Sequence, residues 1–370
     1  MPKQAETWKQ VVFTKCNFSI RWAMLLVCGV VLSAGSLCGQ IAPQPEKPEL
    51  LLPNMPLHDP WILASEADHT YYLYTSNIPF LSKTAGVGTM VYRSTDLRHW
   101  QPPVAVFTLP GGLWARQGGW APEVHFYHGR YYLFTTVHNE ASIIAQPPAV
   151  WRTNYSRGTV IAASDSPMGP FKLLDTTGPV APANFMTLDG TLYVAPDGKP
   201  WMVYAHEWLQ KIDGTIEAVP LKGDLTGAAG NPVYLFKGSD APWINAQAKA
   251  SQDENRYVTD GPELFRTRDG HLLMLWSSYD ARGYVQTIAR SRSGKIEGPW
   301  EQLDPLVKND SGHGMLFRRF DGQLMLILHR PFKNARGKLY EVEDQGDHLK
   351  IIRERSDLDG DASAVQLGTK

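Results

Sequence analysis

The stretch His128-Gly129-Arg130-Tyr131-Tyr132-Leu133-Phe134 joins a polar turn to a run of aromatic and apolar residues. Such a turn followed by such a run is typical of a buried strand. The same pattern recurs four more times along the chain. The repeats are Ala67-Asp68-His69 with Tyr71–Tyr74, Asp197-Gly198-Lys199 with Trp201–Tyr204, Arg268-Asp269-Gly270 with Leu273–Trp276, and Asp321-Gly322-Gln323 with Leu324–Ile327.

A second repeat marks where strands end and return. Its copies are Tyr92–Trp100, Ala162–Phe171 and Ala289–Trp300. A turn and a buried strand that recur about every fifty to seventy residues are typical of stacked β-sheet units. Five units of about four strands each would fill most of Leu57 to Glu354, which predicts an all-β fold, a five-bladed β-propeller. A two-sheet sandwich would not explain this repeat.

The ends of the chain differ from the body. An apolar run from Trp22 to Leu32 follows basic residues, which predicts a signal peptide or, as the alternative, an N-terminal anchor over residues 1–39. Residues 40–56 form a Pro-rich flexible leader, residues 57–355 the propeller and residues 356–370 a polar tail. The body is therefore expected to be exported, to the periplasm or the outside of the cell.

Composition excludes several classes of function. Lys and Arg number 36 against 37 Asp and Glu, a net charge of -1, so nucleic acid and anionic membranes are not expected partners. All three cysteines lie in the first forty residues, which excludes a thiol nucleophile or a Cys-ligated zinc site in the body. Twelve Trp and 15 Tyr offer flat surfaces that could stack on sugar rings, although many will be core. We expect a monomer.

Acidic residues and one histidine recur about ten residues before the repeated strands. In a propeller the innermost strands line a central channel, so side chains at these positions meet although they are far apart in sequence. The candidates are Asp59, Glu123, Asp189, Asp260, Glu263 and His313. An inverting glycosidase needs one carboxylate that deprotonates water and one protonated carboxyl that releases the leaving oxygen. A third acid nearby would keep the second protonated by charge repulsion.

These segments resemble glycoside hydrolase family 43, over nearly all of Leu57 to Pro331. The motifs that carry the resemblance are His58-Asp59-Pro60-Trp61-Ile62, Trp120-Ala121-Pro122-Glu123, Leu188-Asp189-Gly190-Thr191 and Gly312-His313-Gly314. The resemblance implies a five-bladed propeller that hydrolyses arabinose- and xylose-containing polysaccharides, without a cofactor for the chemistry.

The resemblance also implies roles for single residues. Asp59 would be the general base and Asp189 the carboxylate that tunes the pKa of the acid. The family usually has a glutamate directly before Gly-Pro, where this chain has Asp260. We predict Asp260 as the general acid, with Glu263 as the alternative, although alternation from Asp260 would point Glu263 to the opposite face. His313 would lie near a calcium ion in the channel.

The remaining predictions concern the substrate. We expect His58, Trp61, Trp120, Glu123 and His206 to line the sugar-binding pocket. The predicted activity is that of an α-L-arabinofuranosidase or β-xylosidase, with endo-acting relatives such as an arabinanase left open. A carbohydrate-binding propeller that has lost catalysis is the main alternative, because Asp260 replaces the usual glutamate. A phosphorylase would need an Arg and His cluster beside Asp59, and the sequence suggests none.

Overall fold

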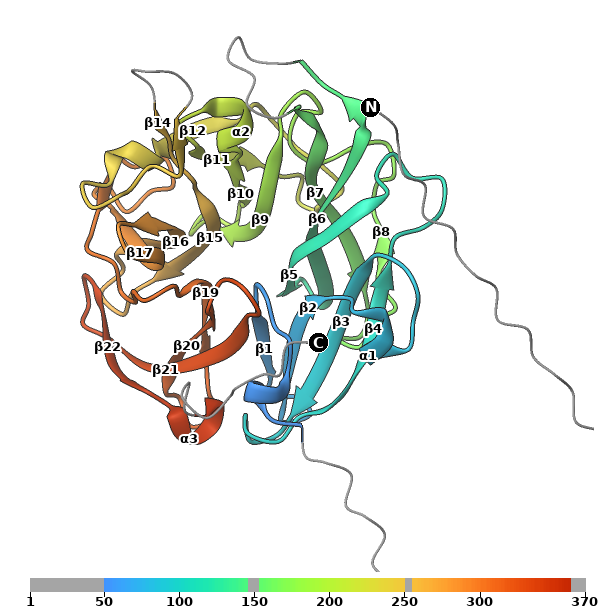
Figure 1. Ribbon diagram of the computed structural model, residues 1–370, viewed down its shortest axis with the longest axis vertical. Helices are drawn as coiled ribbons and strands as arrows, with labels where there is room; N and C mark the ends of the chain where they lie inside the picture. Colours follow the sequence, from blue (N-terminus) through green and yellow to red (C-terminus); the bar gives the residue numbers. More distant parts are fainter. Residues whose placement is uncertain (1–49, 146–152, 250–254, 361–370) are drawn as a thin grey trace, which may run out of the picture. The chain divides into compact units, whose positions relative to one another are not determined.

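Five antiparallel sheets of four strands each form the described part of the chain, and Figure 1 shows them arranged in a ring. The computed structural model describes residues 50–145, 153–249 and 255–360. The predicted export segment at residues 1–39 lies outside the described residues, as do most of the leader and of the tail. The predicted all-β, five-bladed β-propeller is confirmed.

Each sheet, or blade, is a contiguous piece of chain whose strands pair in sequence order. Blade one comprises β1 (Trp61–Ser65), β2 (Thr70–Ser76), β3 (Gly88–Ser94) and β4 (Gln101–Thr108); blade two β5 (Gln117–Tyr127), β6 (Arg130–Ile143), β7 (Tyr155–Ser164) and β8 (Lys172–Leu173); blade three β9 (Thr187–Val194), β10 (Pro200–His206), β11 (Thr215–Pro220) and β12 (Val233–Lys237); blade four β15 (Asp260–Arg266), β16 (Leu272–Asp280), β17 (Gly283–Ser291) and β18 (Trp300–Gln302); blade five β19 (Gly312–Arg318), β20 (Leu324–Arg330), β21 (Arg336–Asp344) and β22 (Leu349–Glu354).

The first strand of each blade lies nearest the centre of the ring, as Figure 1 shows for β1, β5, β9, β15 and β19. The repeated aromatic and aliphatic runs lie on the second strands, β2, β6, β10, β16 and β20. The position of the repeated run relative to the inner strand differs by one residue between blades. Val203 pairs with Thr191 and Leu275 with Glu263, in the way that Phe134 pairs with Glu123. The predicted segments in blades three and four were therefore one residue out of frame.

The turn that opens the second strand of blade two illustrates why the pattern folds in this way. His128 and Gly129 connect β5 to β6 and have φ values of 45° and 82°. Two positive φ angles in a two-residue loop define the hairpin turn whose twist matches that of its strands. Glycine adopts such a φ without a steric penalty, so the His-Gly pair sets the register of the pairing that follows.

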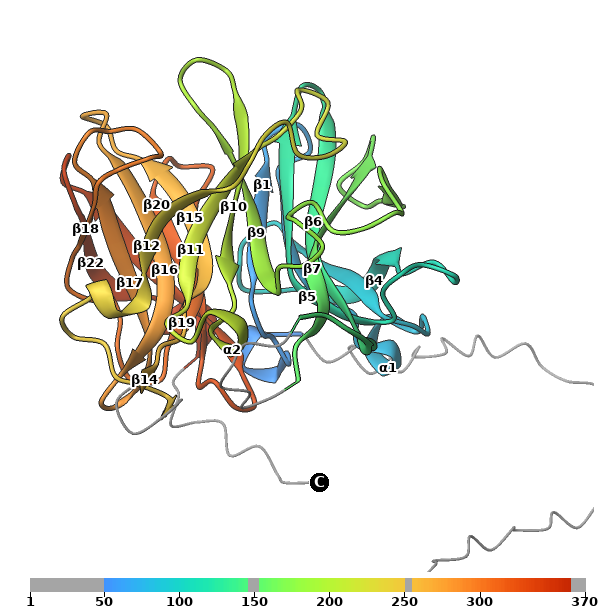
Figure 2. The same cartoon turned by 90° about the horizontal axis from the view of Figure 1, so that it is seen from above.

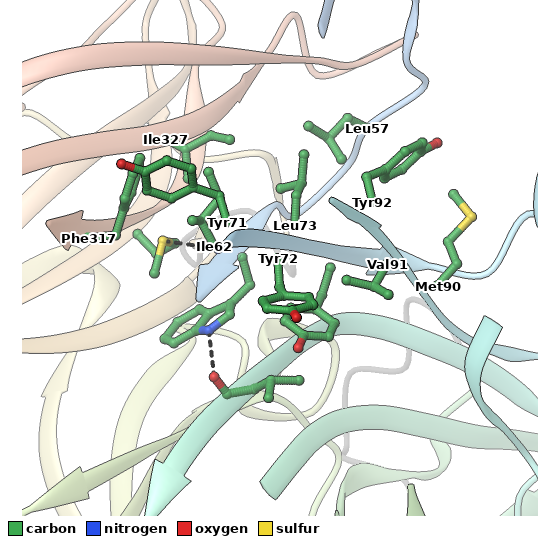
Figure 3. Close-up of a cluster of buried hydrophobic side chains, with 14 of the residues drawn as sticks. Leu57, Ile62, Tyr71, Tyr72, Leu73, Met90, Val91, Tyr92, Phe317 and Ile327 are labelled. Carbon is green, nitrogen blue, oxygen red and sulfur yellow. Dashed lines mark hydrogen bonds between the residues drawn. The ribbon is translucent and has the colours of Figure 1, made fainter. Parts of the chain in front are cut away.

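The hydrophobic core is distributed between neighbouring blades. The largest cluster joins blades one, two and five. Figure 3 shows Tyr71 of blade one beside Phe317 and Ile327 of blade five, with Leu73 and Tyr92 of blade one further along the same cluster. All five are at most 6% exposed. Because each sheet is apolar on both faces, no blade can bury its surface alone, and the ring is held together by packing between sheets.

The ring closes without exchange of a strand between the first and last blades. At the closure β1 contacts β19, and two short helices pack nearby: η1 (Leu52–Asn54), which precedes β1, lies against β21 and against α3 (Ser356–Asp359), which follows β22. Asp359 is buried, and its carboxylate accepts hydrogen bonds from the Leu339 amide at 2.8 Å and from the Lys338 ammonium at 3.2 Å. A buried ion pair thus fixes the end of the propeller to blade five.

Other short elements gather at one end of the sheets. The helices α1 (Pro79–Ser82) and α2 (Trp208–Lys211) follow the second strands of blades one and three, and Figure 2 shows them at the same end as β14 (Asn255–Arg256). The strand β13 (Ala248–Lys249) pairs with β14, and η2 (Gly238–Asp240) follows β12. The inner strands begin at this end, so loops surround the predicted site residues. Within the described residues, no helix has the length and apolarity needed to span a bilayer.

Candidate active site

A bulge interrupts the inner strand of blades two to five at the predicted site residues. The pairing skips two residues in each case: Ala121-Pro122, Asp189-Gly190, Gly261-Pro262 and His313-Gly314. In blade one, Asp59-Pro60 occupies the same place directly before β1. Bulges re-aim side chains beside functional sites. The second residue of each pair is Pro or Gly, so the repeat is visible in the sequence.

The first residue of each bulge has a left-handed backbone. Asp59, Ala121, Asp189, Gly261 and His313 have φ values between 44° and 55°. This conformation is uncommon for residues other than glycine, and its recurrence in every blade indicates a built-in feature of the ring. The predicted register therefore holds for Asp59, Asp189 and His313. In blades two and four the left-handed residues are Ala121 and Gly261. The predicted acids of these blades, Glu123, Asp260 and Glu263, therefore lie one or two residues before or after the left-handed position.

The bulge also places Asp260 and Glu263 on the same side of their strand. Asp260 pairs with Ser277 and Glu263 with Leu275, two residues apart on the partner strand. Side chains two apart on a strand face the same side, so the expectation that alternation separates these two acids is wrong. The reason is the bulge, because Gly261 and Pro262 together stand opposite a single residue of β16 and so shift the alternation by one. The two acids differ in level along the channel instead.

In three blades the amide of the left-handed residue is bound by a second-strand side chain of the preceding blade. Asp189 N–H donates to Thr136 Oγ1 at 2.9 Å, His313 N–H to Ser277 Oγ at 2.8 Å and Asp59 N–H to His329 Nδ1 at 3.3 Å. Each acceptor lies on the second strand, opposite the residue before the bulge. Blade three has Ala205 at this place, opposite Leu188.

Blade four therefore takes a different acceptor. Since the Ala205 side chain has no polar atom, the Gly261 amide donates to Oδ2 of Asp189 at 3.1 Å. This bond joins the predicted tuning carboxylate to the bulge that carries the predicted acid. Burial raises the pKa of Asp189 to about 6, the charge of Asp59 adds to this effect, and His313 and the Gly261 amide oppose it.

Three imidazoles surround one oxygen of Asp59. Oδ1 lies 2.8 Å from Nδ1 of His58, 3.2 Å from Nδ1 of His313 and 3.4 Å from Nδ1 of His329. Burial alone would raise the pKa of Asp59, but its interactions with His313, His58 and His329 lower that pKa well below its usual range. Burial would lower the pKa of His58, yet the charge of Asp59 raises it to about 9. Asp59 is thus held as a carboxylate.

Asp260 has the opposite environment. Burial and the charge of Asp189 raise the pKa of Asp260 well above its usual range, against the effect of a hydrogen bond from Tyr284. The Tyr284 hydroxyl donates to Oδ2 of Asp260 at 3.0 Å. The site therefore holds one carboxylate and one protonated carboxyl, which are the two forms that acid–base catalysis requires at the same pH.

A second level of acids lies deeper in the channel. Glu123 and Glu263 line a cavity of about 10 Å³, about the size that holds one water molecule, together with Asp59 and His313. Burial raises the pKa of both glutamates well above the usual range. Glu123 lies 3.0 Å from His125 Nε2, and Glu263 accepts a hydrogen bond from the Leu316 amide at 2.9 Å.

The predicted sugar-binding residues divide by exposure. Trp120 is 38% exposed, and His58 is half-buried beside Asp59. Trp61 is 8% exposed, and its indole donates to the Val124 carbonyl at 2.9 Å. His206 is 3% exposed and lies 3.0 Å from Glu217. These placements favour contact with a ligand for His58 and Trp120 but a packing role for Trp61 and His206, and Glu123 is buried in the channel.

Sequence reasoning missed the residues that come from the second and third strands. They are Thr136, Ser277, Tyr284 and His329. The three second-strand residues, Thr136, Ser277 and His329, share one signal, a polar side chain just after a buried aromatic or aliphatic run.

Sequence reasoning also expected no Arg and His cluster beside Asp59. Three histidines lie there, because His313 and His329 come from another blade.

Within the described residues, one group could hold a metal ion by geometry. The ligand atoms of His58, Asp59 and His329 all lie within 4.8 Å of one another. These atoms already have partners in each other, since His58 contacts Asp59 Oδ1 and His329 Nδ1 accepts the Asp59 amide. We therefore regard this group as the support of a carboxylate. It is also a different set from the acids around His313 in the channel.

Comparisons with known proteins agree with this geometry. The model of the family described as "Glycosyl hydrolases family 43" matches residues 53–351. The chain is 36% identical to a solved endo-arabinase from Bacteroides thetaiotaomicron VPI-5482, with a TM-score of 0.71, over 81% of this chain and 99% of that chain. It is 24% identical over 316 residues to extracellular endo-alpha-(1->5)-L-arabinanase 1 of Bacillus subtilis (strain 168), covering 80% of this chain and 79% of that protein.

A solved endo-1,4-beta-xylanase from Bacteroides thetaiotaomicron VPI-5482 shares the fold. Its identity is 21% and its TM-score 0.60, over 81% of this chain and 95% of that chain. The family resemblance predicted from the four motifs is thus confirmed. The chain belongs to glycosyl hydrolase family 43.

Proposed function

We propose that the protein hydrolyses arabinose- or xylose-containing polysaccharides with inversion of configuration, and that linear α-1,5-arabinan is the first substrate to test. The observation that carries the proposal is the opposite surroundings of two acids, since three imidazole nitrogens lie within 3.4 Å of one oxygen of Asp59, whereas Asp260 has the Tyr284 hydroxyl as its partner. Asp59 is held as a carboxylate by imidazoles, and Asp260 is held protonated by burial beside Asp189. Likeness to one protein named as an endo-arabinase and to another named as an arabinanase favours arabinan over the substrates of an arabinofuranosidase or a xylosidase.

In the proposed reaction Asp59 acts as the general base. The three imidazole contacts within the described residues involve Oδ1, so we assign Oδ2 as the oxygen that accepts a proton from water. The water oxygen attacks the anomeric carbon from the face opposite the leaving group, and the bond to the leaving oxygen breaks. Charge on Oδ1 stays compensated by His58 and His313 while Oδ2 becomes protonated.

Asp260 supplies the proton for the leaving group. Its proton passes to the glycosidic oxygen, so the alcohol leaves neutral and Asp260 becomes a carboxylate. Asp189 raises the pKa of Asp260 through its charge, which keeps Asp260 protonated before each turnover. Both catalytic groups then return to their starting forms by exchange of one proton each with solvent.

Glu263 is less suited than Asp260 to the role of acid. Its carboxyl lies deeper in the channel, lines the cavity with Glu123, and accepts the Leu316 amide. A sugar ring would have to pass the level of Asp59 and His313 to reach it. We therefore propose Asp260 as the acid and Glu263 as a channel residue.

The acids deeper in the channel fit the predicted calcium ion. Calcium prefers several oxygen ligands, and the Glu123 and Glu263 carboxyls line one small cavity beside His313. The ligand atoms of these three residues do not gather as closely as those of His58, Asp59 and His329, so we propose that Glu123, Glu263 and His313 would hold the ion through water. When bound, calcium would supply positive charge below the catalytic level and would favour the ionised form of the acids near it. The chemical steps above need no cofactor.

We further propose that the protein works outside the cytoplasm as a monomer, in line with the apolar segment near its N-terminus and the extracellular relative. The partner is a glycan, and His58 and Trp120 line its binding site.

Hydrolysis of linear arabinan, arabinoxylan and galactan in phosphate-free buffer tests the proposal. Wild type should release reducing sugar from at least arabinan, Asp59→Ala and Asp260→Asn should reduce kcat at least about 100-fold, and Glu263→Gln should retain most activity. Binding without turnover would instead support a carbohydrate-binding propeller. Turnover that requires added phosphate would support a phosphorylase.

A further inference from the structure

The hydroxyl of Tyr284 lies against the proposed acid. Tyr284 is on β17, the third strand of blade four, and its hydroxyl donates to Oδ2 of Asp260 at 3.0 Å. The side chain is 1% exposed. Burial and the charge of Asp260 raise the pKa of Tyr284 well above its usual range, so the phenol keeps its proton at any working pH. Tyr284 therefore acts as a permanent donor to one oxygen of the acid.

The tyrosine ring is held by its neighbours. It stacks on His329 with ring centres 5.6 Å apart and planes inclined by 10°, and it packs edge-on against Phe332 at 5.1 Å. Tyr279 lies 4.9 Å away on another side. A Cβ at Gly312 would come within 2.4 Å of the ring, so glycine is needed there to admit it. The hydroxyl position is thus fixed by packing from blades four and five.

We propose that Tyr284 is a positioning residue that fixes Oδ2 of Asp260, so that Oδ1 carries the proton and faces the glycosidic oxygen. This inference rests on the proposed function, since it assigns a partner to the acid of that reaction.

The physical reason lies in the symmetry of a carboxyl group. A protonated carboxyl can carry its proton on either oxygen, and only one oxygen can point to the leaving group. A donor that occupies Oδ2 disfavours the proton there, because Oδ2 then acts as an acceptor. Two torsion angles orient an aspartate side chain, and one hydrogen bond from a fixed partner restricts both. The productive form is then the dominant form before substrate binds.

The first test is Tyr284→Phe, which keeps the ring and removes the donor. Two substrates separate a role in acid catalysis from general damage: linear arabinan, whose leaving alcohol needs protonation, and the 4-nitrophenyl glycoside of α-1,5-arabinobiose, whose leaving nitrophenolate needs little. We expect kcat/KM to fall about 10- to 100-fold on arabinan and less than about 3-fold on the aryl glycoside.

The second readout is the pH dependence of kcat/KM on arabinan. The hydrogen bond from Tyr284 favours the ionised form of Asp260, so its removal raises the pKa of Asp260. Activity at high pH requires the protonated acid. The alkaline limb of Tyr284→Phe should therefore move to higher pH, which a purely structural role would not produce.

Tyr279→Phe is the matched control. It removes a hydroxyl from the same aromatic cluster but leaves the bond between Tyr284 and Asp260 in place. We expect wild-type kinetics and an unchanged alkaline limb. If Tyr284→Phe lowers turnover of both substrates equally, or leaves the alkaline limb in place, the inference is overturned.

Asp260→Asn separates this inference from the proposed function. If Asp260→Asn is inactive on arabinan while Tyr284→Phe matches wild type, only the role of Tyr284 fails. If Asp260→Asn retains wild-type activity, the proposed acid is wrong, and the role of Tyr284 falls with it.

Discussion

The backbone amide of Gly261 donates a hydrogen bond to Oδ2 of Asp189, at 3.1 Å, and so joins the inner strands of blades three and four. The corresponding amides of Asp189, His313 and Asp59 instead donate to side chains on the second strand of the preceding blade. Their acceptors are Thr136, Ser277 and His329. Ala205 offers no such acceptor. Because the side chain at position 205 has no polar atom, the Gly261 amide donates to the carboxylate of Asp189, which we assign to catalysis.

A serine at position 205 should compete for this amide. Asp189 and Asp260 both have raised pKa values, and we expect them to share one proton, which is productive only on Asp260. If Ala205→Ser takes the Gly261 amide, Asp189 loses a bond that favours its ionised form and holds the proton more often. We expect the plateau of kcat/KM to fall by about tenfold, the equivalent of a charged hydrogen bond of about 1.5 kcal/mol.

Ala205→Gly controls for the change of side-chain size, since it adds no acceptor. Its plateau should stay near that of wild type even if the protein melts at a lower temperature. Equal plateaus for Ala205→Ser and wild type would show that the serine hydroxyl does not replace Asp189 as the acceptor.

The charge of Asp189 should determine the alkaline limb of the pH profile. That charge raises the pKa of Asp260, so Asp189→Asn should lower it. The acid would then lose its proton at lower pH, and the alkaline limb should move to lower pH, with kcat reduced about 10- to 100-fold. Kinetics on arabinan between pH 4 and 10 measure this shift. A limb that stays in place would contradict the role of Asp189 as the group that tunes Asp260.

Calcium should stabilise the protein through the deeper acids. A ligand that binds only the folded state raises its stability, so the melting temperature of the metal-free protein should rise with added calcium chloride. Glu123→Gln combined with Glu263→Gln removes both carboxylates from the cavity and should abolish the rise. Titration calorimetry of both proteins provides the affinity. Wild type that binds no calcium would refute this site.

The closure of the ring should depend on Asp359. Asp359→Ala removes the nearer of the two carboxylates beside the buried Lys338, leaving Glu354 at 3.5 Å, and it removes the acceptor of the Leu339 amide. Breaking a buried pair from one side costs about 3 kcal/mol of unfolding free energy, measurable by urea denaturation. Asp357→Ala is the control, because the Asp357 side chain is 60% exposed and its pair with Arg355 should contribute less than about 1 kcal/mol. Equal losses in the two variants would argue against the closure described above.

The fold was predictable because its cause is local and repeated. The His128-Gly129 turn and the run after it contain the whole signal for one hairpin, and five copies predict a propeller. The left-handed positions of Asp59, Asp189 and His313 were predicted only as members of a shared register. Their backbone conformation follows from bulges, which a count of alternating residues does not detect.

The partners of the site residues were not predictable in the same way. Tyr284 and His329 lie on strands whose sequence reads as buried core. Tyr284 reaches Asp260 across its own blade, whereas His329 reaches Asp59 only because the last blade meets the first. Trp61 is an aromatic residue two positions after the predicted base, as a sugar-binding residue could be, yet its indole donates a hydrogen bond to the Val124 carbonyl of blade two. Residue type and spacing identify the acids. The contacts that set their pKa values depend on which blades meet.

The stereochemistry of the first product tests the central claim most directly. Proton NMR of wild type acting on linear α-1,5-arabinan, recorded before mutarotation, shows the anomer released. The proposed action of Asp59 on water predicts β-arabinofuranose at the new reducing end, with no such signal from Asp59→Ala. Release of the α-anomer would mean retention, which requires a covalent intermediate and contradicts the role of Asp59 as a base.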